Sequence, residues 1–185
     1  MSFYDVPVLG KRLALLRELV PKAEIIAVLV DPNFAAHDAK VREIEEAART
    51  LGQKIVMFNA PREQEIEFSA IMRSGTGALH VGAGTFINSR RSQLVGLAAF
   101  HAIPASYFTA GFVEAGGLMS YGSSQTDAYR RAGTYVARIL NGDKAGELPV
   151  ELPMNFELTI NLRTAKALGL TVSPSLLARA DQVFQ

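Results

Sequence analysis

The residues with the clearest chemical potential lie in the segment 79–91, LHVGAGTFINSRR, where Gly82 and Gly84 follow an apolar run and precede a helix-like sequence. Glycine-rich turns in this position can cradle phosphates. A dinucleotide fingerprint needs a third glycine, which is Ile87 here, and no phosphate-binding lysine follows. The pattern therefore disfavours a nucleotide. It leaves two interpretations, a backbone wall for another small ligand or glycines that serve the turn alone.

A second polar turn, DPNF at 31–34, follows an earlier apolar run. Asp31 suggests a phosphoacceptor, but the acidic pair and the lysine that such chemistry requires are not evident at the other strand ends. Pro32 and Asn33 favour turns for local reasons. Asn33 is therefore either a turn residue or a side-chain amide that contacts a ligand.

Aromatic side chains also end two later apolar runs, SYF at 106–108 and SYG at 120–122. Binding pockets are mostly apolar with a few well-placed polar groups, and the residues at these strand ends fit that description. The sequence predicts five ligand-binding residues: Asn33, Gly84, Thr85, Tyr107 and Tyr121.

No catalytic apparatus is visible in the sequence. His37, His80 and His101 are scattered without metal-ligand spacing, no nucleophile motif occurs, and cysteine is absent. His80, in the middle of an apolar run, is interpreted as a satisfied interior histidine, and His101 as a surface residue at a helix end. The sequence predicts no catalytic residue, no metal and no cofactor.

Alternating strands and helices must position these residues. Apolar runs at 25–30, 54–60, 77–83, 103–108 and 117–122 are separated by helical patterns at 11–20, 41–51 and 66–72 and by a helix capped by Asn88 or Ser89. This rhythm predicts an α/β fold, a Rossmann-like parallel sheet sandwiched by helices. We expect three parts: a leading segment and crossover helix (1–23), a ligand-binding lobe (24–122) and a C-terminal tail (123–185).

The tail has its own local signals. Ser124, with Asp127 three residues later, resembles a capping box and opens a helix over 125–140 with one apolar face. Residues 141–153 are rich in turn formers and predict an exposed connection. The alternating segment 156–162 is consistent with an edge strand, and Ser173 followed by Pro174 starts a last short helix.

Composition limits the classes of partner. The 185 residues carry a net charge of +1 and 49% hydrophobic residues, so a sizeable core is expected and nucleic-acid binding is not. The longest apolar runs are far below the roughly 20 residues that a membrane span requires. The first residues show no basic region followed by an apolar core, so no signal peptide is predicted in this chain.

Several stretches together resemble the substrate-binding proteins of ABC transporters, in the uncharacterised group related to tryptophan- and tyrosine-binding proteins. The most specific are EAGGLMSYG (114–122) and FELTINLRTAKALGL (156–170), and the resemblance runs from Gly10 to Gln185. It implies one lobe of a type I periplasmic-binding-protein fold, the second lobe plus the C-terminal tail. It also implies a chain that is either a fragment or a one-lobe descendant.

The resemblance further implies a solute-binding component of an ABC-type importer that binds a small molecule such as an amino acid and delivers it to an ABC permease. Its location would be periplasmic or extracellular and membrane-associated. We expect a homodimer, swapped or not, because the apolar face of 125–140 must be covered. Two alternatives stay open, a ligand-sensing module of a signalling system and a small Rossmann-like enzyme.

Overall fold

The computed structural model describes residues 8–34, 36–60, 68–153 and 155–185 and contains one seven-stranded sheet in the order β2-β1-β3-β4-β5-β6-β7. Every neighbouring pair is parallel except β5 and β6, which are antiparallel. The predicted α/β fold is confirmed. The strands are β1 (Ile25–Val30), β2 (Lys54–Asn59), β3 (Ala78–Val81), β4 (Ala105–Tyr107), β5 (Met119–Ser123), β6 (Phe156–Asn161) and β7 (Gln182–Phe184).

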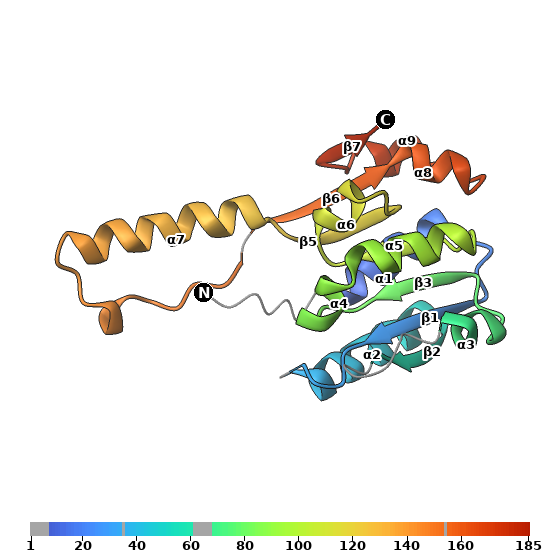
Figure 1. Cartoon of the computed structure of the whole chain (residues 1–185), viewed down its shortest axis with the longest axis horizontal. Helices are drawn as coiled ribbons and strands as arrows, with labels where there is room; N and C mark the ends of the chain where they lie inside the picture. The colour runs from blue at the N-terminus through green and yellow to red at the C-terminus, as the bar shows by residue number, and fades with distance from the viewer. Residues whose placement is uncertain (1–7, 35, 61–67, 154) are drawn as a thin grey trace.

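Helices cover both faces of this sheet (Figure 1). Successive residues of a strand point to opposite faces, so Ile26 and Val28 of β1 enter one core while Ala27 and Leu29 enter the other. The first core holds the packing faces of α1 (Val8–Leu19), α2 (His37–Leu51), α8 (Leu162–Ala167) and α9 (Pro174–Leu177). The second holds those of α3 (Phe68–Arg73), α4 (Thr85–Ser89), α5 (Arg91–Phe100) and α6 (Ala110–Glu114).

Local sequence signals set several helix ends. Gly52 adopts the left-handed conformation, φ 63°, just after α2, and the neighbouring N–H groups close the helix on the carbonyls of Ala48 and Arg49. The Ser124 hydroxyl accepts from the Asp127 N–H at the start of α7 (Gln125–Leu140). Both ends agree with the sequence prediction.

Two local predictions were wrong. The helix expected to be capped by Asn88 or Ser89 is α5, which begins at Arg91 with Arg90 as its cap, and a separate short helix, α4, begins at Thr85 directly after Gly84. The segment 156–162 is not an edge strand, because β6 lies between β5 and β7 and pairs with both. The helix expected at 66–72 lies partly outside the described residues, with α3 seen from Phe68.

The segment from α7 to residue 153 forms an arm that extends away from the body of the molecule and turns back toward it (Figure 1). None of the residues of α7 is buried. The returning chain contacts the helix through the Tyr135 hydroxyl, which donates to the Pro149 carbonyl at 2.7 Å, and through an Arg131–Glu151 ion pair at 3.0 Å. A single turn of 3₁₀ helix, Ala145–Glu147, lies at the far end of this arm.

Candidate functional site

A cavity of about 400 Å³ opens at the edge of the sheet where the parallel strands end. Its walls come from the residues that follow β1, β3, β4 and β5, together with α1 and the start of α7. Ligands of open α/β sheets bind at this edge. The apolar part of the wall comprises Val8, Leu9, Phe34, Ala83, Phe108 and the ring of Tyr129; the polar part comprises Arg12, Lys40, Thr85, Asn88, Thr109, Ser123 and Gln125.

Arg12 brings a permanent positive charge to this wall, although only 2% of the residue is exposed. Its Nη1 lies 3.4 Å from the Tyr121 carbonyl and its Nη2 lies 3.2 Å from His80 Nε2. A guanidinium only donates hydrogen bonds, so His80 Nε2 accepts here. The guanidinium is therefore fixed between two strands.

This contact determines the state of His80. Because Nε2 accepts, the ring proton of the neutral imidazole is on Nδ1, which donates to the Ser106 hydroxyl at 3.3 Å. Burial, and secondly the neighbouring Arg12 charge, lower the pKa of His80 well below its ordinary value of 6.5. His80 is thus a neutral, doubly bonded interior residue, which confirms the interpretation from sequence and makes it a support for Arg12.

A smaller recess of about 20 Å³ adjoins the main cavity. Four residues line both spaces: Leu9, Phe34, Lys40 and Ala83. Asp31 and His80 line the recess but not the main cavity. We name this space the inner recess.

Gly84 lines the main cavity and lies against Asp31, which explains one glycine of the segment 79–91. A Cβ on residue 84 would lie 2.6 Å from the Asp31 Cβ and 2.7 Å from its Oδ2, closer than side-chain contacts tolerate. The glycine is therefore required by the close approach of the buried carboxylate. Gly82 is constrained in the same way by the Leu29 carbonyl, 2.8 Å from a Cβ placed there.

Of the five predicted ligand-binding residues, Gly84 and Thr85 line the cavity. Asn33 is exposed in the turn after β1, where its N–H donates to Asp31 Oδ1 at 2.9 Å. Tyr107 is 1% exposed and stacks on Phe112 with 4.7 Å between ring centroids, and burial raises the pKa of its hydroxyl. The structure does not bring Asn33 or Tyr107 to the cavity wall.

Tyr121 occupies a different groove, at the base of the arm, where its ring stacks on Phe156 at 6.2 Å. Its main-chain carbonyl nevertheless accepts from Arg12, so Tyr121 supports the site through its backbone. The strand-end reasoning pointed to the edge of the sheet where this cavity lies, but the direction in which each aromatic side chain points was not available from the sequence.

Sequence reasoning missed Arg12, Phe34 and Asn88 as cavity residues, whereas Phe108 was expected at a strand end of the pocket. A signal for Arg12 was present, since it lies three residues after Leu9 and four before Leu16, on the buried stripe of α1. A charged residue at a core-facing helix position indicates a specific partner or a ligand.

Metal chemistry finds no support in the described ranges, where no three His, Cys, Asp or Glu side chains are grouped closely enough to hold an ion. Within the same ranges, no helix has both the length and the apolar character needed to cross a bilayer.

Comparison with known proteins identifies the family. The model of the family described as ABC transporter substrate binding protein matches residues 2–184. The chain belongs to the ABC transporter substrate-binding protein family. A search of curated proteins finds no matching sequence.

Solved structures share the fold of this substrate-binding chain. An ABC domain from Streptococcus pneumonia, in complex with L-Trp, is 26% identical with a TM-score of 0.84, and the match covers 96% of this chain and 62% of that one. A conserved domain protein from Vibrio cholerae is 23% identical with a TM-score of 0.83, covering 95% and 60%. A ligand-free, open substrate-binding protein from Clostridium difficile is 22% identical with a TM-score of 0.67, covering 96% and 60%. The chain thus spans about three-fifths of the length of these neighbours.

Proposed function

We propose that this chain is the solute-binding component, or one lobe of the solute-binding component, of an ABC-type importer, and that the 400 Å³ cavity holds its ligand. The observation that carries the proposal is the composition of the cavity wall. Aromatic rings from Phe34 and Phe108 and a fixed cation from Arg12 meet at the carboxyl edge of a parallel sheet.

The wall favours a small molecule that has both an apolar part and a negatively charged group. Arg12 presents N–H donors suited to a carboxylate, and its position between His80 and the Tyr121 carbonyl prepares it for binding without reorganisation. Phe34, Phe108 and Tyr129 offer the apolar surface. An amino acid fits this description, and the L-Trp in the pneumococcal neighbour supports the same class.

The proposed activity is binding and release, without bond chemistry. In a complete substrate-binding protein, closure of a second wall over the ligand would create the state that an ABC permease recognises. We propose a periplasmic or extracellular, membrane-associated location on the basis of the family. Of the five residues predicted from the sequence, we propose Gly84 and Thr85 as ligand contacts because they line the cavity, and Tyr121 as a support for Arg12 through its carbonyl.

The test is ligand-induced thermal stabilisation of the full chain against the twenty L-amino acids. A ligand at one hundred times its dissociation constant adds about 2.7 kcal/mol. For a chain of this size that raises the melting temperature by roughly 5–10 °C.

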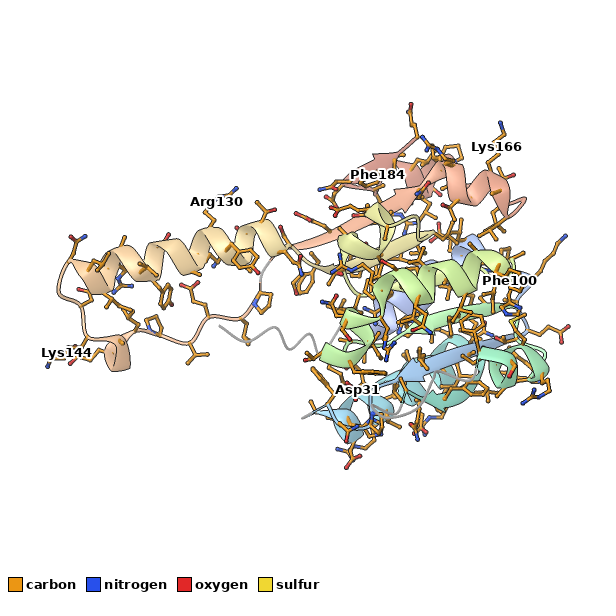
Figure 2. All side chains as sticks on the ribbon, in the orientation of Figure 1. Asp31, Phe100, Arg130, Lys144, Lys166 and Phe184 are labelled. Atoms are coloured by element: carbon orange, nitrogen blue, oxygen red, sulfur yellow. The ribbon has the colours of Figure 1, made fainter. Side chains whose placement is uncertain are left out.

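Matched aromatic variants locate the effect. Phe34→Ala should abolish the shift because Phe34 lines the cavity, whereas Phe100→Ala should preserve it, since Phe100 is exposed at the other end of the sheet (Figure 2). No shift with any amino acid, or equal loss in both variants, would contradict the proposed function.

We further propose that a second copy of this chain covers the arm. Val136, Ile139 and Leu140 of α7 are 55%, 42% and 81% exposed, and Val150 and Leu152 on the returning segment of the arm are also exposed. An apolar helix face of this kind is a typical protein interface.

Oligomeric state at micromolar concentration tests this second proposal. Light scattering should show a dimer of the native chain. Ile139→Glu should give monomers, and Thr134→Glu, an exposed change on the same helix away from that face, should not. A monodisperse native monomer would refute it.

A further inference from the structure

Asp31 carries a buried carboxylate that is only half satisfied. The residue is 2% exposed and follows β1 at the carboxyl edge of the sheet (Figure 2). Oδ1 accepts from the Asn33 N–H at 2.9 Å, whereas Oδ2 is buried and has no hydrogen-bond partner among the residues that the structure describes. Leaving a buried carboxylate oxygen without a donor is costly, so an Oδ2 retained in this position points to a donor that is absent from the unliganded chain.

The space beside this carboxylate has the size of one small polar group. The inner recess measures about 20 Å³, and a single water needs roughly 10–15 Å³ on the same scale. A primary ammonium group is of similar size. Because the inner recess shares Leu9, Phe34, Lys40 and Ala83 with the main cavity, a ligand can place one end in each space.

Among the residues that line the inner recess, Asp31 is the one that offers a negatively charged hydrogen-bond acceptor. His80 uses Nε2 to accept from Arg12 and Nδ1 to contact Ser106. Lys40 carries donors and no acceptor, and His37 contacts the Asp31 carbonyl through Nδ1 at 3.2 Å. A positively charged donor is therefore the group that matches this space.

We infer that Asp31 binds the primary ammonium group of the ligand, while Arg12 binds its carboxylate in the main cavity. His80 lines the inner recess together with Asp31 and also contacts Arg12, so one imidazole adjoins both the recess and the cation. A ligand that satisfies both is a zwitterionic α-amino acid, in preference to the hydroxy acid or carboxylic acid of the same shape. This inference rests on the proposed function and specifies the ligand class of that site.

Matched ligand pairs test this assignment by calorimetry on the full chain. Each pair differs at the ammonium group alone: L-tryptophan and indole-3-lactate, L-phenylalanine and 3-phenyllactate, L-leucine and 2-hydroxyisocaproate. The native chain should bind the amino acid of its preferred pair at least about tenfold more tightly. Asp31→Asn should weaken the amino acid by about 10- to 100-fold, the loss of a charged hydrogen bond, and change the hydroxy acid less than about twofold.

Asp38→Asn is the matched control, because it removes the same charge from an exposed position on α2 and should leave both affinities unchanged. Equal affinity of the native chain for both members of a pair, or equal loss of both in Asp31→Asn, would overturn the inference and leave the proposed function intact. Absence of binding by every probe, with the twenty amino acids included, would overturn the proposed function and this inference with it.

The unliganded protein gives a second, independent measurement. Asparagine keeps the oxygen that accepts from Asn33 and removes the buried charge, so Asp31→Asn should melt at the native temperature or above it while its ligand-induced shift is lost. A lower melting temperature would assign Asp31 a structural role and overturn the inference.

Discussion

Gly84→Ala is the substitution for which the structure makes the sharpest stability prediction. The new methyl group would lie 2.6 Å from the Asp31 Cβ, 2.7 Å from its Oδ2 and 3.1 Å from its Cγ, whereas ordinary van der Waals contacts lie at 3.4–4 Å. Neither the backbone at residue 84 nor the Asp31 side chain can move easily. Gly84 precedes α4, and Asp31 is buried and holds the Asn33 N–H through Oδ1.

The cost follows from overpacking. Forcing a methyl group into a packed interior typically costs about 1–3 kcal/mol, and displacing the carboxylate also weakens its bond to Asn33, worth about 1.5 kcal/mol or more because the acceptor is charged. We expect a total of about 2–4 kcal/mol. For a chain of this length each kcal/mol lowers the melting temperature by roughly 2–4 °C, so the decrease should be about 4–16 °C.

Gly96→Ala is the control for this experiment. Gly96 lies within α5, is exposed, and a Cβ there meets no atom within 4 Å. Alanine should stabilise the helix by about 0.5–1 kcal/mol. Urea denaturation of the two variants should therefore move the midpoint in opposite directions. A Gly84→Ala variant as stable as the native chain would refute the claim that residue 84 is glycine because of Asp31.

Two further predictions concern the body of the fold. Gly122→Ala places a Cβ 2.0 Å from the Phe108 carbonyl oxygen, so its urea midpoint should fall further than that of Gly84→Ala, by more than about 3 kcal/mol; an equal or smaller fall would contradict this packing. The folded-state pKa of His80 is lowered, so the unfolded chain binds more protons below pH 6.5, and unfolding free energy should decline from that pH downward with a slope approaching about 1.4 kcal/mol per pH unit. His80→Gln, followed by denaturation at a series of pH values from 8 to 5, should flatten this decline; an unchanged slope would assign it to other groups.

The strands and helix ends that the sequence predicted correctly depend on short-range chemistry. The run IIAVLV reads as a strand buried on both faces, and all but its first residue are buried. Gly52 and Ser124 end and start their helices through hydrogen bonds within one helical turn, so the neighbouring residues were enough to predict both caps. The sequence pointed to the carboxyl edge, where the cavity lies, for the same reason, since parallel strands end together.

The parts that sequence reasoning missed depend on distant partners. Tyr107 follows the pattern of a strand-end ligand residue, but its ring turns to Phe112 of α6, a contact that the pattern of β4 does not encode. Arg12 reaches His80, 68 residues away, and Asp31 fits against Gly84, 53 positions later in the chain. Such pairs emerge when separate elements pack, and no local periodicity contains them.

The arm begins and ends at adjacent points of the sheet. Ser123 and Phe156 are register partners in β5 and β6, and the Ser124 N–H donates to the Asn155 carbonyl at 2.9 Å. Topologically the arm is an insertion in a β-hairpin, whose removal would leave a short turn and an intact seven-stranded sheet. Apart from Gln125 and Tyr129, which line the cavity, its sequence can therefore change to suit whatever it contacts without altering the cavity wall, so most of the arm and the cavity can evolve at separate rates. A protease that cuts within the arm should leave a folded body still held together by β5 and β6.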